Sequence, residues 1–397
     1  MLPPPGFRPR ANQGMLDQMP TPSPIRRETI ALPEASLGTQ RTWTALHYGT
    51  PGQGPKAYIH TGLHADELPG LLLCDHLGRL LDAAAARGEI LGEIILVPFT
   101  NPIGLGQWVN GTHLGRFEMG GAGNFNRGYP VLGPEVAQRI GHQLTDNAAA
   151  NVTLIRATMK TILADLQPVK EMDHLRLTIM KHAIDADIAL DLHCDTRALM
   201  HLYLGTPLWP DAKDLAADLG SHATLLAEDS GGSSLDEALG GPWWHLAKAF
   251  PDKPIPPACL ATTVELRGES DVTDALAAQD AAALFRFLQR RGVLAGDPGP
   301  LPALINDASD LTASDLLVAP VPGVLVYKVG LGDRVKKGDL VAEIVNPLTH
   351  GRTPITATTD GFILVMRHTH NVRPGFQVAK VVGTEPLAHR QGYLLSD

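Results

Sequence analysis

The 397-residue chain contains little cysteine and no long hydrophobic run. Its three cysteines, Cys74, Cys194 and Cys259, are too few for a disulfide framework, and their spacing fits no zinc finger. No apolar stretch approaches the roughly 18 residues that a membrane-spanning helix needs. The N-terminal stretch MLPPPGFRPR has prolines where a secretion signal has its apolar segment. These absences predict a cytoplasmic protein that does not enter a membrane.

Positive charge is also scarce. Lysine and arginine together number 33, against 42 aspartates and glutamates, so the net charge is -9, and no segment is rich in basic residues. Nucleic acids and anionic membrane surfaces attract cationic proteins, so we expect neither as a partner. The expected partner is a small-molecule substrate, and self-association into a homo-oligomer is left open.

The residues that are present are typical of a folded globular protein. Hydrophobic residues make up 44% of the chain and charged residues 19%, which excludes wholesale disorder. The 40 glycines and 32 prolines are a large share of the chain, since the two together average roughly 12% in other proteins. This excess predicts many turns, as in an α/β enzyme that carries an all-β appendage.

The pattern of residues divides the chain into four parts. Residues 1–38 are rich in proline, arginine and polar residues, which predicts an extended N-terminal arm. Residues 39–295 are expected to form a catalytic domain, and residues 296–315 a linker rich in glycine and proline. Residues 316–397 are expected to form a small β domain.

Strands and helices alternate in the expected catalytic domain. Continuous apolar runs predict strands, and apolar residues at helical spacing predict helices. The predicted strands are residues 43–48, 56–60, 93–99, 188–193 and 260–266; the predicted helices are residues 68–86 and 275–290, with two or three more in a helical insertion at about 133–183. Strand, helix and strand in this order favour a parallel sheet with helical crossovers.

The last part of the chain contains an internal repeat. Residues 319–325 align with residues 357–363, and residues 335–338 align with residues 372–375. Two such units of short strands and glycine turns predict a pseudo-symmetric β-sandwich. The segment resembles the biotinyl/lipoyl barrel-sandwich domain, but residues 343–352, which connect the two halves, contain no lysine that could carry a cofactor. We therefore expect a structural or substrate-shaping module.

Three separated segments carry residue types that bind metals. His64 and Glu67 lie three residues apart just after a predicted strand, and His193 ends another strand. Because ligands gather at the carboxyl ends of strands in an open α/β sheet, these side chains are expected to face one crevice. Glu265 interrupts a third apolar strand, where an unpaired carboxylate is costly and needs a partner.

Two histidines and one carboxylate, with one position left for water, are the composition of a catalytic zinc site. We predict one Zn2+ per chain, held by His64, Glu67 and His193. Zinc lowers the pKa of bound water towards about 7, and Glu265 would accept the proton and pass it to the leaving nitrogen. Asp191 shares a strand face with His193 and is a candidate to orient its imidazole. The alternatives are that His64 and Glu67 cap a helix and that His193 is a hydrogen-bonded core residue.

In this order, the motifs resemble those of the succinylglutamate desuccinylase/aspartoacylase family, a branch of the zinc carboxypeptidase superfamily. The resemblance covers roughly residues 40–295, with His64 and Glu67 on the family motif G-x-H-x-[DN]-E, His193 on D-L-H and Glu265 on the catalytic glutamate. It implies an α/β fold with a zinc-carboxypeptidase-like mixed sheet flanked by helices and followed by a small all-β domain. It also implies hydrolysis of an amide, or less often an ester, by zinc-activated water.

Four residues are candidates for substrate binding. Asn126 and Arg127 fall on the family motif [DN]-[LF]-N-R, which implies that they hold a substrate carboxylate. A guanidinium offers paired donors that match a carboxylate. Arg116, in the same glycine-rich loop, is a candidate for stabilising the oxyanion on the scissile carbonyl. Arg197 is a candidate for a second substrate carboxylate, and otherwise for an ion pair with Asp195.

The predicted function is that of a zinc-dependent hydrolase, a deacylase or amidohydrolase. Its substrate would be a small N-acyl amino acid or related amide that bears a carboxylate. A metallocarboxypeptidase that trims a peptide C-terminus is an alternative. A non-catalytic binding module that keeps the fold is a third possibility, against which the complete set of motif residues argues.

Overall fold

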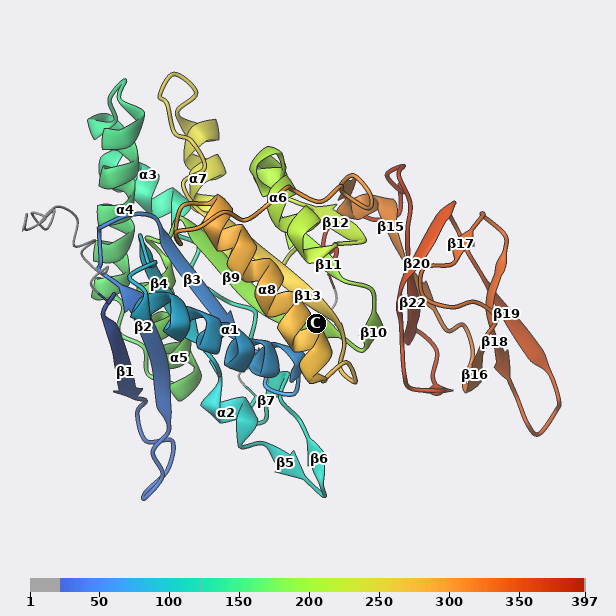
Figure 1. Ribbon diagram of the computed structural model, residues 1–397. Coiled ribbons are helices and arrows are strands. Elements are labelled where there is room, and N and C mark those ends of the chain that lie inside the picture. Colours follow the sequence, from blue (N-terminus) through green and yellow to red (C-terminus); the bar gives the residue numbers. More distant parts are fainter. Residues whose placement is uncertain (1–21, 122, 396–397) are drawn as a thin grey trace, which may run out of the picture.

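A nine-stranded sheet forms the centre of the larger part of the molecule (Figure 1). The computed structural model describes residues 22–121 and 123–395. The strand order is β1-β2-β4-β3-β9-β13-β11-β12-β14. These strands are β1 Ile25–Ala31, β2 Thr42–Gly49, β3 Lys56–Thr61, β4 Glu93–Val97, β9 Ile188–Asp195, β11 His201–Leu204, β12 Ala223–Leu226, β13 Leu260–Gly268 and β14 Ser309–Asp310.

The middle of this sheet is parallel. Strands β4, β3, β9 and β13 run in one direction, and β2 and β11 flank them in the opposite direction. Every residue of β4 and nearly every residue of β3 and β9 is buried, as expected for central strands with helices on both faces. The predicted α/β class with a mixed sheet is confirmed. The parallel centre also means that β3, β9 and β13 end at the same edge, where the site lies.

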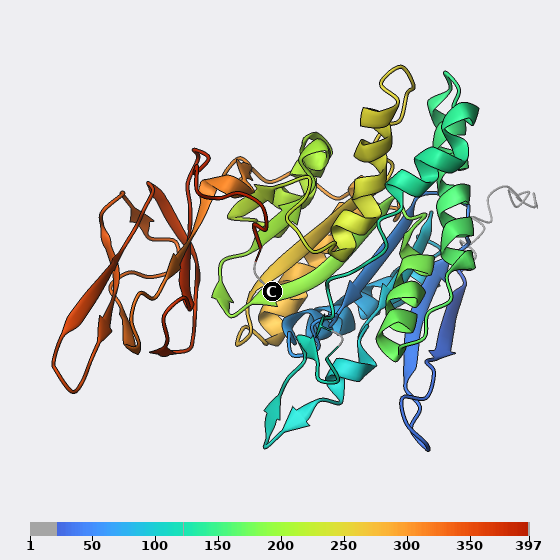
Figure 2. The same ribbon diagram turned by 180° about the vertical axis from the view of Figure 1, so that it is seen from behind.

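Helices cover both faces of the sheet (Figures 1 and 2). Three pack on one face: α1 Pro69–Ala86, α6 Trp209–Leu219 and α8 Asp274–Arg290. Four pack on the other face: α3 Gly133–Ile140, α4 Ala148–Asp165, α5 Glu171–Ala183 and α7 Leu235–Ala249. The zone predicted to be helical at about 133–183 thus contains α3, α4 and α5, and their apolar sides are used to cover the sheet.

Short elements fill the longer connections. Between β4 and α3 lie α2 Pro102–Leu105, β5 Trp108–Val109, β6 Thr112–His113, β7 Phe117–Glu118 and β8 Gly123–Asn124. Single 3-10 turns occur at η1 Gly141–Gln143, η2 Thr206–Leu208 and η3 Leu311–Ala313. The loop around β7 and β8 delivers three of the four predicted substrate-binding residues, Arg116, Asn126 and Arg127.

Two segments outside the predicted catalytic domain join its sheet. Strand β1 falls in residues 1–38, the predicted arm, and pairs antiparallel with β2 along its whole length. Strand β14 falls in residues 296–315, the predicted linker, and pairs with β12. An open sheet edge offers unpaired backbone groups that recruit such segments, and composition carries no signal of that pairing. Residues 1–21 of the predicted arm lie outside the described residues.

The C-terminal β domain consists of two packed sheets, so the predicted small all-β domain is confirmed. Its strands are β15 Ser314–Val318, β16 Gly323–Tyr327, β17 Arg334–Val335, β18 Leu340–Val345, β19 Arg352–Thr356, β20 Gly361–Met366, β21 Asn371–Val372 and β22 Gln377–Val382. The two repeats exchange strands, because β16 pairs with β21 and β17 pairs with β20. Strand β10, Arg197–Ala198, leaves the catalytic part and pairs with β20, which ties the two parts together.

Candidate metal centre and its cavity

His64, Glu67 and His193 meet at the carboxyl ends of two central strands. His64 and Glu67 lie in the connection from β3 to α1, and His193 lies in β9. The parallel register of these strands aligns Thr61 with Leu192, which brings the turn after β3 beside His193. One ligand-type atom from each of the three residues lies within 4.8 Å of the other two. All three residues are at most 5% exposed.

The Glu67 carboxylate lies between the two imidazoles. Its Oε1 is 2.9 Å from Nδ1 of His64, and its Oε2 is 2.8 Å from Nδ1 of His193. The backbone N–H of Cys194 donates to the same Oε2 at 3.0 Å. Both histidines therefore turn Nδ1 towards the carboxylate, so the donor atoms converge.

The outer nitrogens of both rings have their own hydrogen-bond acceptors. Nε2 of His64 donates to Oδ1 of Asn124 at 2.8 Å, and Nε2 of His193 donates to Oδ1 of Asp191 at 2.8 Å. His60 donates to the same Asp191 oxygen at 2.8 Å. Such contacts select the tautomer that leaves Nδ1 available to a metal. Asp191 thus lies where it can orient His193, whereas Asn124, the first residue of the matched [DN]-[LF]-N-R motif, was not predicted to contact His64.

Electrostatics favour an ionised carboxylate at this centre. Burial disfavours charge on Glu67, but the two histidines outweigh it and hold the pKa of Glu67 well below its usual range. Burial also disfavours charge on His193, but Asp191 and Glu67 outweigh it and hold the pKa of His193 well above its usual range. Burial and the nearby Arg116 lower the pKa of His64. A carboxylate between two imidazoles is a donor set suited to a divalent cation.

Glu265 reaches the same centre from β13. In the parallel register of β9 and β13, Glu265 lies opposite His193. Its Oε2 is buried and has no hydrogen-bond partner among the described residues. Burial and the negative charge of Glu67 raise the pKa of Glu265 to about 8. The predicted base is therefore next to the predicted ligands and has an unpartnered oxygen.

Asn126 and Arg127 enter the cavity from the loop after β8. Nδ2 of Asn126 donates to Oδ2 of Asp191 at 3.0 Å, and its Oδ1 accepts from the N–H of Leu235 at 3.0 Å. Nη1 of Arg127 donates to the carbonyl of Asn126 at 2.8 Å. The Arg127 side chain lies against Gly232, where a Cβ would come within 2.5 Å of its Cδ and where φ is +83°. Both the close approach and the backbone angle require glycine at that position.

Arg116 contacts the metal-ligand candidates directly. Its Nη1 donates to Oε1 of Glu67 at 2.9 Å and to Nδ1 of His64 at 3.0 Å. The side chain is 42% exposed, so it has room to move. Because two cations repel each other at such distances, we expect a metal ion on these atoms to displace the guanidinium into the cavity.

Arg197 is the one predicted site residue that the structure does not bring to the centre. It is exposed in β10, pairs with Met366, and is not among the residues that line the cavity. The alternative ion pair with Asp195 is also absent from the described part of the chain, where Asp195 pairs with Arg367 at 3.3 Å instead. Arg197 turns away because its backbone joins the sheet of the C-terminal β domain.

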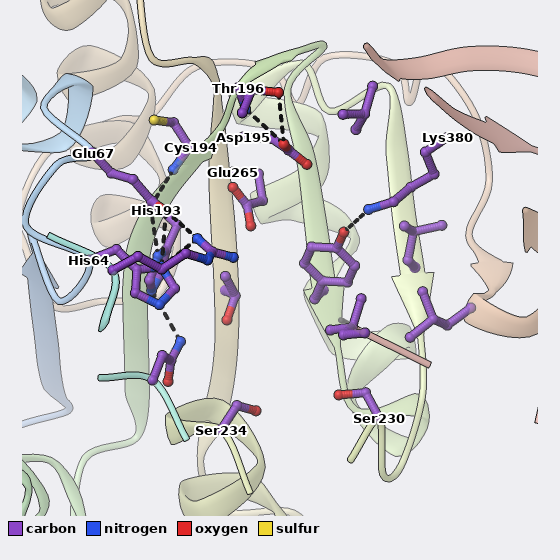
Figure 3. Close-up of a pocket in the computed structure, with 18 of the residues that line it drawn as sticks. His64, Glu67, His193, Cys194, Asp195, Thr196, Ser230, Ser234, Glu265 and Lys380 are labelled. Atoms are coloured by element: carbon purple, nitrogen blue, oxygen red, sulfur yellow. Dashed lines mark hydrogen bonds and ion pairs between the residues drawn. The ribbon is translucent and has the colours of Figure 1, made fainter. Parts of the chain in front are cut away.

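A cavity of about 300 Å³ contains the centre (Figure 3). The seven other predicted site residues line it: His64, Glu67, Arg116, Asn126, Arg127, His193 and Glu265. The C-terminal β domain supplies the opposite wall, which includes Leu316, Val365, Arg367, Gln377, Ala379 and Lys380. The small β domain therefore shapes the site.

Comparison with known proteins agrees with this geometry. The profile of the succinylglutamate desuccinylase/aspartoacylase catalytic domain matches residues 53–291, more than half of the chain. The chain belongs to this family. A search of curated protein sequences found no match.

Solved structures share this fold over nearly the whole chain. A family protein from Shewanella amazonensis SB2B is 27% identical, with a TM-score of 0.79 over 90% of this chain and 98% of that one. A second, from Shewanella frigidimarina NCIMB 400, is 24% identical, with a TM-score of 0.77 over 91% and 97%. The product-bound ectoine utilization protein EutE (DoeB) from Ruegeria pomeroyi is 17% identical, with a TM-score of 0.63 over 92% and 97%. The last two comparisons show a shared fold.

Family membership supports hydrolase activity, since the family takes its name from deacylases. The group of His64, Glu67 and His193 could hold a metal ion. Within residues 22–121 and 123–395, no helix has both the length and the apolar character needed to cross a membrane. The cytoplasmic location and self-association stay predictions.

Proposed function

We propose that the protein is a zinc-dependent hydrolase that removes the acyl group from a small, carboxylate-bearing N-acyl amino acid or related amide. One observation carries the proposal: an unpartnered, buried oxygen of Glu265 lies beside the converging ligand atoms of His64, Glu67 and His193. A buried carboxylate oxygen without a partner is costly. Because this oxygen lies beside the candidate metal ligands, we infer that its hydrogen-bond partner is one of the reactants, the attacking water or the substrate.

The three side chains suit zinc, and we propose one zinc ion per chain. Imidazole nitrogen and carboxylate oxygen are its usual ligands, and three protein ligands leave a fourth position for water or substrate. The acceptors on the outer ring nitrogens, Asn124 and Asp191, support this assignment because metal-bound histidines commonly have such partners. Zinc bound here would supply Lewis acidity, which lowers the pKa of water to about 7 and polarises a carbonyl.

We propose that Glu265 moves the proton. As the attacking water bonds through its oxygen to the amide carbonyl carbon, its proton passes to the Glu265 carboxylate. The carboxyl then gives that proton to the amide nitrogen as the C–N bond breaks, which releases an amine and a carboxylic acid. The pKa of about 8 in the metal-free protein suits such an exchange, and a neighbouring cation would shift it downward towards neutral pH.

The other cavity residues would orient the substrate. Asn126 and Arg127 would hold the carboxylate of the amino-acid half, with the guanidinium donating in pairs. Arg116, once displaced from His64 and Glu67, would stabilise the negative charge that develops on the carbonyl oxygen. Arg197 has no part in this proposal, because it lies outside the cavity.

The test compares the wild type with Glu265→Gln and with Glu34→Gln, an exposed control. We expect the wild type to cleave N-acyl amino acids, to lose this activity on chelation, and to regain it with zinc. Glu265→Gln should lower kcat by about 100- to 10,000-fold while it still binds one zinc ion. Full activity of Glu265→Gln would overturn the mechanism.

The same assay separates the alternatives. Cleavage of C-terminal dipeptides without cleavage of any acyl-amino acid would favour a metallocarboxypeptidase. Absence of both metal and amide hydrolysis would favour a binding module.

A further inference from the structure

The C-terminal segment, residues 383–395, returns from the β domain to the catalytic domain. Strand β22 ends at Val382, and the segment then crosses to the loop that precedes α7 (Figure 2). The backbone N–H of Leu394 donates to the carbonyl of Ser230 in this loop at 2.9 Å. Leu394 is 7% exposed and packs in the apolar core that joins the two domains, and Leu395 lines the cavity. The segment therefore has a defined place beside the site.

Arg390 ties the end of this segment to the β domain. Its Nε donates to the carbonyl of Ser314, in β15, at 3.0 Å, and its Nη2 donates to the carbonyl of Leu394 at 2.6 Å. Nε2 of His389 lies 2.9 Å from Oδ1 of Asp315, also in β15. Because Arg390 contacts both Ser314 and Leu394, the position of Leu394 follows that of the β domain.

Tyr393 covers the loop formed by residues 230–234. A Cβ on Gly231 would come within 2.3 Å of Cδ1 of Tyr393, and φ of Gly231 is +98°. The tyrosine ring thus rests on the backbone of Gly231, where a larger residue would leave it no room. Tyr393 is 77% exposed, so its removal should cost the fold little.

The same loop holds Arg127 and the two residues that follow it. The N–H of Gly128 donates to the carbonyl of Gly232 at 2.8 Å, and the N–H of Tyr129 donates to the carbonyl of Ser233 at 3.1 Å. The Arg127 side chain lies against Gly232. The C-terminal segment, the 230–234 loop and Arg127 are therefore linked by a continuous series of contacts.

The sequence of the loop explains why it needs support. Gly231 and Gly232 are adjacent and both have positive φ, +98° and +83°, and glycine loses more conformational freedom on ordering than any other residue. Glu237, in α7, fixes the start of the loop, because its Oε1 accepts from the N–H and the Oγ of Ser230, each at 2.6 Å. The ring of Tyr393 adds a contact at Gly231 from the C-terminal segment.

We propose that Tyr393, together with the backbone of Leu394, is a positioning residue that acts through the 230–234 loop to hold Arg127 in place for the substrate carboxylate. This inference rests on the proposed function, in which Arg127 binds that carboxylate. Tyr393 acts on Arg127 and not on the reacting atoms. Its loss should therefore weaken substrate binding and leave the metal centre and the hydrolytic step unchanged.

The experiment is a double-mutant cycle between Tyr393→Ala and Arg127→Met. The proteins are the wild type, the two single variants, the double variant and Gln391→Ala. Gln391 is an exposed control, whose side chain donates to the carbonyl of Ala388 in the same segment. Each protein is measured for kcat and KM with an N-acyl amino acid and with its carboxamide, which lacks the carboxylate.

We expect Arg127→Met to raise KM for the carboxylate substrate by about 10- to 100-fold, and Tyr393→Ala to raise it by about 10-fold, as for the loss or weakening of a charged hydrogen bond. Neither kcat nor the KM of the carboxamide should change in Tyr393→Ala. With Arg127→Met already present, the tyrosine substitution should add nothing, because the two residues act on one interaction. Gln391→Ala should behave as the wild type.

An equal rise of KM on both substrates, or the same effect of Tyr393→Ala with and without Arg127, would overturn the inference, because a merely structural tyrosine affects all of them alike. A second readout needs no activity. The amide hydrogens of Gly128 and Tyr129, which donate to the 230–234 loop, should exchange with solvent faster in Tyr393→Ala than in the wild type and Gln391→Ala. If the wild type cleaves no amide, the proposed function fails, and this exchange still tests whether Tyr393 supports the loop; unchanged exchange would contradict it.

Discussion

The two walls of the cavity, one from the catalytic domain and one from the C-terminal β domain, differ in their side chains and in the contacts that these make. On the catalytic-domain wall, Glu67 contacts both histidines and Asp191 holds His193 from outside, while Glu265 has a buried oxygen with no partner among the described residues. On the C-terminal wall, the apolar Leu316, Val365 and Ala379 alternate with polar side chains, and the buried Lys380 donates to the hydroxyl of Tyr203. The first wall carries the candidate metal ligands and the predicted base, and the second wall closes the cavity opposite them. The comparison teaches that the predicted reactive groups all come from the catalytic domain, while the C-terminal β domain contributes the shape of the facing wall.

The same difference explains what the sequence could predict. His64, Glu67, His193 and Glu265 were predicted together because parallel strands end at one edge of a sheet, and the structure brings all four to that edge. Each of these residues lies inside an apolar run or just after one. The run predicts a strand, and the strand fixes the position of the residue. Local pattern is therefore sufficient to locate these four residues.

The contacts that escaped prediction are those made between distant segments. Asn124 holds His64 from a two-residue strand that no periodic pattern marks. Lys380 reads in sequence as an ordinary polar residue of a short strand, and only the packing of the two domains buries it. Arg197 was predicted near the site because it follows β9 closely, but pairing with β20 turns it away. Strand pairing and packing between the two domains join segments that are far apart in the chain, so neither segment alone contains a sequence pattern that predicts these contacts.

The largest expected effect tests how strongly the C-terminal β domain, which forms the second wall of the cavity, packs against the catalytic domain. Leu364, fully buried in β20, belongs to the apolar core that joins the two domains. Leu364→Ala should lower the free energy of unfolding by about 2–5 kcal/mol, because it leaves a cavity in that core. Chemical denaturation measures the change. The control, Leu348→Ala, removes a side chain that is 87% exposed and should change stability by less than about 0.5 kcal/mol. Equal stability of both variants would show that this core does not couple the domains.

An intermediate effect tests whether the hydrogen bonds of the catalytic-domain wall orient the candidate metal ligands. Asp191→Asn weakens the acceptor on the outer nitrogen of His193, so zinc affinity should fall about 10- to 100-fold. Competition with a chromophoric chelator measures the affinity. The matched control is Asp185→Asn, because Asp185 pairs with Lys56 away from the cavity. Unchanged affinity in Asp191→Asn would mean that the network around His193 does not tune the metal.

The smallest effect concerns pH and an acid of the first wall. Burial and the charge of Glu237 raise the pKa of Asp236 to about 7. Because this value lies above the roughly 3.9 of an unfolded aspartate, the stability that Asp236 contributes is complete below about pH 4 and is lost as the pH rises through about 7. The melting temperature of metal-free Asp236→Asn, measured against the wild type, should therefore rise progressively between about pH 4 and pH 7 and then level off. A difference that does not vary with pH would contradict the raised pKa.

Anomalous scattering at the zinc edge, from crystals of protein purified without added metal, tests the central claim most directly. We predict a single peak per chain, bounded by Nδ1 of His64, Nδ1 of His193 and the Glu67 carboxylate, with Arg116 moved off those atoms. A fully active protein in which the three side chains are still hydrogen-bonded to one another and no metal lies between them would contradict it.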